Sequence, residues 1–342
     1  MSFTVKRRMP SVEEVLAIQP LPPDVASVKK TRDSELQQIF EGRDNRFIVI
    51  IGPCSAHDET AVCDYVSRLA KLQEQVAEKL FLVPRIYTNK PRTTGTGYKG
   101  MLHQPDPNRD PDMVEGLRAI RSMHIRALSE SGLAAADEML YPDNAAYLAD
   151  VLGYVAVGAR SVENQQHRLV ASGFDVPVGM KNPTSGDVSI MMNSIAAAQA
   201  AHTFIYNTNE VETPGNHLTH AIMRGAVNHF GQAIPNYHYE DLSHLVKLFS
   251  DRALKNPGVV VDANHANSNK RYSEQPRIVM DVLDHRRYSP ELKQLVKGVM
   301  VESFIVEGAQ QADGNVYGQS ITDPCIGWGI TEKLILDMAD RC

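Results

Sequence analysis

The residues of this sequence that could do chemistry gather at the ends of short apolar runs. Phe47–Ile51 is one such run, and Cys54 follows it after Gly52 and Pro53. If the runs are strands of one parallel sheet or barrel, the side chains at their ends meet on a single face. The residues in this position are Cys54, Arg85, Glu138, Arg160, Lys181, Arg224, Asp262 with His265, and Glu302, with Asp323 in a later loop.

Four of these residues are cations, namely Arg85, Arg160, Lys181 and Arg224. Arginine offers a planar fork of donors that matches carboxylate and phosphate groups, and lysine adds a compact charge. A nearby basic segment, residues 89–94, suits a further phosphate and contains Lys90, Arg92 and Thr93. A single arginine could be an ordinary surface charge, but solvated faces do not place a cation at each of four strand ends. The set therefore predicts a site for acidic groups.

The softer donors indicate a metal ion. Cys54, His265, Glu302 and Asp323 offer the thiolate, imidazole and carboxylate ligands that first-row divalent ions share. Their wide separation in the sequence makes the spacing a weak signal. Each residue alone also has a structural interpretation, for example Cys54 as a small buried apolar side chain and Glu302 as the partner of an arginine.

The elements that must position these residues follow an alternating β/α pattern. The apolar runs are 47–51, 81–86, 133–138, 154–158, 176–180, 202–206, 258–262 and 297–302. Helices are expected near 60–78, 112–131, 143–150, 163–172, 188–200, 240–254, 275–284 and 331–340. Eight such units predict a closed (β/α)8 TIM barrel, an α/β fold, as one catalytic domain over residues 47–342.

Two segments lie outside this repeat. Residues 1–46 predict an N-terminal arm with two helices, the first starting after Ser11 and the second running from Asp24 to Phe40. Residues 207–231 are rich in turn residues, and we expect them to form an insertion with a small strand pair after the sixth strand.

Composition limits the class of protein. The chain has 342 residues, of which 43% are hydrophobic and 22% charged, as in ordinary soluble domains. The net charge of −6 argues against a general nucleic-acid surface, and no apolar run is long enough to cross a membrane. Four cysteines without a CxxC pair, and no secretory signal, predict a cytoplasmic protein with reduced thiols.

Several short motifs carry these residues in order along the chain. They are IGPCS, KPRTT, GAR at 158–160, Lys181–Asn182, MRG at 223–225, DANHANS at 262–268, VMVES at 299–303 and SITDPCIGW at 320–328. Together they resemble the class I family of 3-deoxy-D-arabino-heptulosonate 7-phosphate (DAHP) synthase. The resemblance implies a transferase on a TIM barrel that condenses phosphoenolpyruvate with erythrose 4-phosphate, the first step of the shikimate pathway to the aromatic amino acids.

The resemblance also implies a role for single residues. The metal ligands would be Cys54, His265, Glu302 and Asp323, with Mn²⁺, Fe²⁺, Co²⁺ or Zn²⁺ as the single divalent ion. Phosphoenolpyruvate would contact Arg85, Arg160, Lys181 and Arg224, with Glu138 in the same pocket, and erythrose 4-phosphate would contact Lys90, Arg92 and Thr93. The catalytic residues would be Lys90, Cys54 and His265, and His167 and Lys99 are further candidates for the lining of the site.

The resemblance says less about feedback regulation and oligomeric state than about the active site. Feedback-regulated members bind an aromatic amino acid through the arm and the barrel insertion, and the arm of the best-known bacterial members carries an acidic pair. Here residues 5–9 read VKRRM, so we expect this arm not to hold the ammonium group of such an effector. By analogy, the chain is expected to form a homodimer or homotetramer.

Two alternatives to this function stay open. The first is a related synthase that uses another aldose phosphate, or a metal-dependent sugar-phosphate aldolase. The second is a barrel that serves as a partner without catalysis. The KPRTT segment favours erythrose 4-phosphate, and the complete set of metal ligands favours an enzyme.

Overall fold

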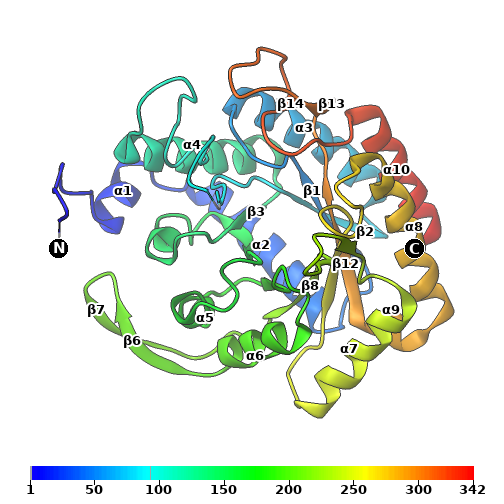
Figure 1. Cartoon of the computed structure of the whole chain (residues 1–342). Helices are drawn as coiled ribbons and strands as arrows, with labels where there is room; N and C mark the ends of the chain where they lie inside the picture. Colours follow the sequence, from blue (N-terminus) through cyan, green and yellow to red (C-terminus); the bar gives the residue numbers. More distant parts are fainter. Residues whose placement is uncertain (1, 93) are drawn as a thin grey trace.

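The chain folds around a barrel of parallel strands with helices on the outside (Figure 1). The computed structural model describes residues 2–92 and 94–342. Around the barrel the strand order is β2-β1-β12-β11-β8-β5-β4-β3, and a parallel bridge between Arg85 and Ala136 joins the two ends of this series. The strands are β1 (Phe47–Gly52), β2 (Leu80–Pro84), β3 (Ala135–Glu138), β4 (Leu152–Val157), β5 (Val178–Lys181), β8 (His220–Met223), β11 (Val259–Asp262) and β12 (Val296–Glu302).

Strand β1 shows why these apolar runs become barrel strands. All of its residues are buried, because one face lies in the barrel and the other lies under helices. Ile48 and Ile50 belong to the cluster inside the barrel, whereas Val49 and Ile51 belong to the cluster between the strands and the helices. The continuous β-branched run is therefore the signature of a strand covered on both sides.

The helices form the outer layer, and their apolar stripes pack onto the outward side chains of the strands. They are α3 (Glu59–Val76), α4 (Met113–Ser131), α5 (Gln165–Ala171), α6 (Val188–Gln199), α7 (Tyr239–Asp251), α8 (Gln275–Tyr288), α9 (Pro290–Leu295) and α10 (Trp328–Arg341). Short 3-10 helices form at η1 (Pro142–Tyr147) and η2 (Tyr272–Glu274). The segment expected as a helix at 143–150 is thus a 3-10 turn, and α9 is an addition to the expected set.

The N-terminal arm contains the two expected helices. Helix α1 (Val12–Ile18) starts at Ser11, whose side chain and that of Glu14 form a capping box. Helix α2 (Pro23–Phe40) brings Ile39 and Phe40 into the cluster of side chains inside the barrel. The end of α2 therefore covers the N-terminal end of the barrel.

The prediction that residues 202–206 form the sixth barrel strand is wrong. The run His202–Tyr206 forms β6, which pairs antiparallel with β7 (Asn209–Thr213) outside the barrel. In β6, partly buried residues alternate with exposed ones, so one face of this strand packs on the protein and the other faces solvent. In β8, by contrast, all four residues are buried. The sixth barrel strand is therefore β8, and the β6–β7 pair comes before it.

A small strand pair does follow the sixth barrel strand. It consists of β9 (Ala226–Val227) and β10 (Ala233–Ile234), which are antiparallel. Another short pair, β13 (Val306–Ala309) and β14 (Gln319–Ser320), lies in the loop after β12 and leads to Asp323. In the described part of the chain, no helix combines the length and the apolar character needed to cross a bilayer.

Candidate active site

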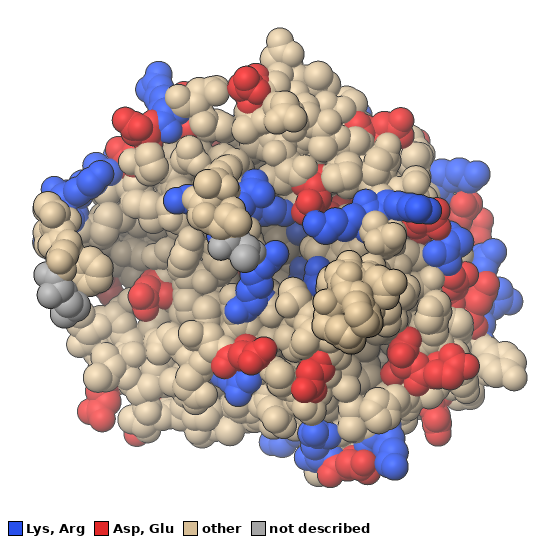
Figure 2. All heavy atoms as spheres, in the orientation of Figure 1, with Lys and Arg blue, Asp and Glu red and all other residues tan. Residues whose placement is uncertain are grey.

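A cavity of about 290 Å³ lies at the C-terminal ends of the barrel strands. Lys and Arg side chains gather across the middle of the face that Figure 2 shows. Of the residues predicted from the sequence, Glu302 lies beside the lining rather than in it, and Thr93 lies outside the described residues. His167 and Lys99 are not among the described residues of the lining, which include Cys54, Arg85, Lys90, Arg92, Glu138, Arg160, Lys181, Arg224, His265 and Asp323.

The turn after β1 aims Cys54 at this cavity. Strand β1 ends at Gly52, where a Cβ atom would clash with the backbone carbonyl of Arg85, so the close approach of the two chains requires glycine. Cys54 is fully buried, and its Sγ lies 3.3 Å from Oδ2 of Asp323. The donor atoms of Cys54, Glu302 and Asp323 all lie within 4.8 Å of one another. Three of the four predicted metal ligands thus meet at one point.

The fourth predicted ligand, His265, lines the same cavity but is not part of this group of donors. Its backbone has a φ of 51°, which is uncommon for a residue with a side chain. Its Nδ1 atom lies 2.9 Å from Oδ2 of Asp262. A carboxylate at this nitrogen would orient the ring and fix its tautomer, as it does for many histidines that bind metals.

The surroundings of Glu302 fit a cation. Its Oε1 atom is buried and has no hydrogen-bond partner in the described structure, although it forms an ion pair with Nη2 of Arg85 at 3.1 Å. Its Oε2 atom accepts a hydrogen bond from Nδ2 of Asn264 at 2.5 Å. Gln275 holds the backbone of Glu302 through two further bonds. One oxygen is therefore fixed by a hydrogen bond while the other forms only an ion pair, and together with a thiolate and a second carboxylate this suits a divalent ion.

Lys90 lies against two of these donors. Its Nζ is 2.5 Å from Sγ of Cys54 and 3.3 Å from Oδ2 of Asp323. Burial alone would lower the pKa of Lys90, but Cys54, Asp323 and Glu302 together outweigh it and raise that pKa. Lys90 is therefore protonated at neutral pH. Burial and then Glu302 raise the pKa of the Cys54 thiol, so the thiolate needs a nearby positive charge.

The other half of the cavity offers donors to anions. Arg85 is buried over the ring of Tyr87, 3.8 Å from its centroid, and Lys181 is buried with Nζ 3.5 Å from Oδ2 of Asp262. Burial lowers the pKa of Arg224. Nε of Arg85 and Nη1 of Arg224 are buried without a hydrogen-bond partner in the described structure. Because unsatisfied buried donors are costly, these two groups are suited to bind an anionic ligand.

Arg160 and Glu138 complete the predicted set. Arg160 follows β4 and is exposed, so it lies at the mouth of the cavity, whereas Glu138 ends β3 and is buried. A Cβ at Gly158 would lie 2.5 Å from Oε1 of Glu138, so the GAR motif keeps space for this carboxylate.

The sequence places Asp262 at a strand end but does not predict its role, which is to contact both Lys181 and His265. Burial alone would raise its pKa, but His265 and Lys181 outweigh this and lower it, so the carboxylate stays charged between two functional side chains. Its place in the DANHANS motif was the available signal. Tyr87 packs against Arg85, but the sequence does not predict this role because Tyr87 looks like one more apolar residue after β2.

Comparison with known proteins shows the family of this chain. The DAHP synthetase I family model matches residues 25–335. A phospho-2-dehydro-3-deoxyheptonate aldolase of Haemophilus influenzae is 41% identical over 92% of this chain and 86% of its own length. The Phe-sensitive form of Escherichia coli is 38% identical over 89% of this chain and 86% of its own.

A solved structure shows the same fold. The phospho-2-dehydro-3-deoxyheptonate aldolase of Francisella tularensis matches with a TM-score of 0.92 at 29% identity, over 99% of this chain and 98% of that one. The family match extends over most of the barrel and includes every strand that supplies a residue to the cavity. The chain therefore belongs to the DAHP synthetase I family, the 3-deoxy-7-phosphoheptulonate synthases that its motifs had indicated.

Proposed function

We propose that this chain condenses phosphoenolpyruvate with erythrose 4-phosphate to give DAHP and phosphate, with one divalent metal ion. The observation that carries this proposal is a single site with unsatisfied groups of both signs. Arg85 and Arg224 hold buried donors without acceptors, and Glu302 holds a buried oxygen that forms no hydrogen bond and is paired only with the charge of Arg85. The first two groups suit an anionic substrate, and the third suits a cation.

The cations of the site would hold phosphoenolpyruvate through its carboxylate and phosphate. Arg85, Lys181 and Arg224 reach it from the strand ends β2, β5 and β8, and Arg160 closes on it from the mouth. This arrangement fixes the orientation of the enol carbon and offsets the repulsion between two phosphorylated substrates. Arg92, whose Nε donates to the carbonyl of Tyr98 at 2.8 Å, lies on the loop proposed to hold the phosphate of erythrose 4-phosphate.

The proposed metal ligands are Cys54, His265, Glu302 and Asp323. A divalent ion bound there would supply Lewis-acid polarisation of the aldehyde of erythrose 4-phosphate. Lys90 would donate a proton from Nζ to the aldehyde oxygen as C3 of phosphoenolpyruvate attacks the aldehyde carbon. Water then adds at C2 and phosphate leaves. Asp262 would hold Lys181 and His265 in place throughout.

Phosphate release tests this function. The purified protein is incubated with phosphoenolpyruvate, erythrose 4-phosphate and Mn²⁺, and phosphate is measured with and without EDTA. We expect release that requires both substrates and is lost after dialysis against EDTA. Activity that persists after extended chelation would overturn the metal assignment. Much faster turnover of arabinose 5-phosphate than of erythrose 4-phosphate would overturn the substrate assignment and favour the related synthase.

A further inference from the structure

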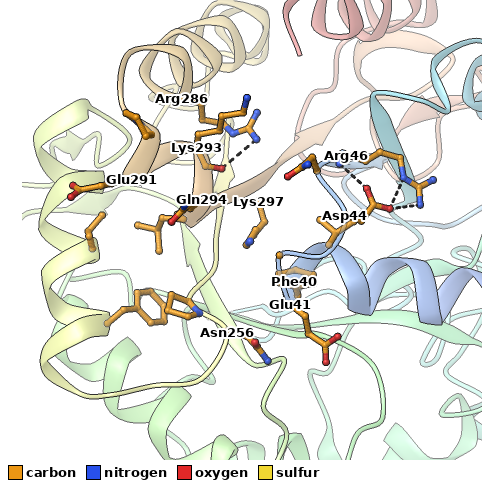
Figure 3. Close-up of a pocket in the computed structure, with 18 of the residues that line it drawn as sticks. Phe40, Glu41, Asp44, Arg46, Asn256, Arg286, Glu291, Lys293, Gln294 and Lys297 are labelled. Atoms are coloured by element: carbon orange, nitrogen blue, oxygen red, sulfur yellow. Dashed lines mark hydrogen bonds and ion pairs between the residues drawn. The ribbon is translucent and has the colours of Figure 1, made fainter.

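A second and larger cavity, of about 770 Å³, lies at the opposite end of the barrel from the candidate active site. It is enclosed by the end of α2, by α7 and by the α8–α9 turn, next to the residues that start β12 (Figure 3). Phe40, Phe249 and Leu295 form part of its wall. Strands β1 and β12 run from this cavity to Cys54 and Glu302, so the two sites are separated by the height of the barrel.

Two cations in this cavity lack an ion pair with a carboxylate in the described part of the chain. Arg286 is only 9% exposed, and its Nε is buried without a hydrogen-bond partner in the described structure. Its Nη2 donates to the carbonyl of Lys293 at 3.5 Å, and its guanidinium packs 4.3 Å from the centre of the Phe47 ring. Lys297 is half-buried at the start of β12. Within residues 2–92 and 94–342, neither side chain forms an ion pair with a carboxylate.

The acidic residues around the cavity are engaged elsewhere or exposed. Asp44 forms an ion pair with Arg46 at 2.7 Å, and Glu41 pairs with Arg43. Glu291 is exposed on α9.

The thiol of Cys342 is a further neighbour of Arg286. Burial raises the pKa of that thiol, so it is neutral at pH 7 and does not balance the charge of Arg286.

The uncompensated charge has a physical consequence. Burial, and then Arg286, lower the pKa of Lys297, and burial lowers the pKa of Arg286. Placing two like charges in a partly dry cavity is unfavourable unless an opposite charge joins them. A bound anion would supply that charge and the acceptor that Nε of Arg286 lacks.

We propose that this cavity binds a small organic anion, with a carboxylate or phosphate group held between Arg286 and Lys297. The anionic group accepts from the guanidinium and the ammonium, and the rest of the molecule packs on the apolar wall of Phe40, Phe249 and Leu295. The site stands apart from the catalytic cavity, and its existence does not depend on the proposed reaction.

The test measures how fast an amine-acylating reagent modifies Lys297, by peptide mass mapping of the intact folded protein. The probes are inorganic phosphate and succinate, each in a concentration series at matched ionic strength because salt alone screens charge. Lys247, which is exposed on α7, serves as the control. We expect modification of Lys297 to fall hyperbolically, to about one tenth when the anion exceeds its dissociation constant tenfold, and that of Lys247 to stay constant.

The two probes separate the sources of the anionic group. Protection by phosphate alone assigns a phosphate group, protection by succinate alone assigns a carboxylate, and protection by both assigns either oxyanion. Rates at Lys297 that neither anion changes would overturn the proposal.

Variants provide the second readout. Arg286→Met should abolish the protection of Lys297. If that variant does not fold, Lys297→Met is compared with Lys247→Met by the gain in melting temperature on adding each anion. We expect a smaller gain for Lys297→Met, and equal gains in the two variants would contradict the proposal even if an anion also binds in the catalytic cavity.

Discussion

Cys54 lies between groups that act on its thiol in opposite directions. Burial and Glu302 favour the neutral thiol, whereas the ammonium group of Lys90 at 2.5 Å favours the thiolate. A divalent ion would add a stronger positive charge and make the thiolate the stable form. The residue is thus suited to bind a metal, and without that metal burial favours its neutral thiol.

We expect Cys54→Ala to lose the metal and the activity while keeping the fold. Removal of a metal ligand should lower metal affinity and phosphate release by at least about 100-fold, since loss of even an outer-shell partner costs 10–100-fold. Metal content per chain after gel filtration and the initial rate of phosphate release are the measurements.

Cys63→Ala is the matched control for this variant. Cys63 is equally buried, lies in α3 in the same cluster of buried side chains, and burial raises its pKa to about 12. Both variants should lose a similar, small part of the free energy of unfolding, about 1 kcal/mol. A Cys54→Ala protein that keeps its metal and its activity would show that Cys54 is only a core residue.

At the scale of elements, β8 places an ionisable residue inside the barrel. His220 starts this strand, with Nε2 2.7 Å from the hydroxyl of Tyr154 and Nδ1 2.9 Å from the carbonyl of Leu218. Both ring nitrogens are satisfied when the ring is neutral, because Nδ1–H donates to the carbonyl and Nε2 accepts from the hydroxyl. Burial lowers the pKa of His220 to about 3.

This shift predicts a loss of stability in mild acid. An unfolded histidine takes up a proton near pH 6.5, whereas folded His220 does so only near pH 3. Between these values the unfolded state binds one more proton, so the free energy of unfolding falls as pH falls, by up to about 1.4 kcal/mol per pH unit.

Urea unfolding of the wild type and of His220→Asn at pH 7.5 and 5.5 checks this prediction. We expect the variant, which starts from a lower stability, to lose about 1 kcal/mol less between the two pH values. His244→Asn, a change at an exposed position of α7, should follow the wild type. Parallel losses in the wild type and His220→Asn would show that folded His220 takes up its proton at about the same pH as an unfolded histidine.

The same strand shows how far the sequence determines the elements. The barrel, its strand-end residues and most helices were predictable because strands covered on both sides read as continuous apolar runs. The segments HTFIY and HAIM are both short and partly apolar, and only tertiary packing decides that the first lies outside the barrel and the second inside. The contact between Asp262 and Lys181 joins distant segments, so no local pattern carries it, whereas His265 lies in the same motif as Asp262.

At the scale of the whole molecule, the arm and the β6–β7 pair share one side of the barrel (Figure 1). The η1 turn contacts both, because Tyr147 donates to the carbonyl of Pro10 and Tyr206 donates to that of Pro142. Arg7 pairs with Asp112, which holds the arm against the start of α4. This side therefore joins the N-terminal arm with segments from the middle of the chain.

Exposed apolar side chains on these segments predict self-association through this side. Phe3 is 86% exposed, Val5 85% and Ile205 75%, which is unusual for large apolar residues in one region of a monomer. We expect a homodimer or homotetramer in light scattering. Ile205→Asp should shift the mass toward the monomer, because a buried charge without a partner disfavours the interface.

Tyr288→Ser, at an 82% exposed position on α8, controls for a general effect of changing surface apolar residues and should leave the mass unchanged. Circular dichroism should show the same helix content in both variants, since neither side chain packs in the core. Deletion of residues 2–10 removes Phe3 and Val5 and leaves β6 intact. It should therefore also lower the number of chains in each particle. Two outcomes would contradict the prediction: a wild-type protein that is monomeric at micromolar concentration, or an Ile205→Asp variant with the same particle mass as the wild type. Either would show that the exposed arm and β6 do not form an interface between copies of the chain.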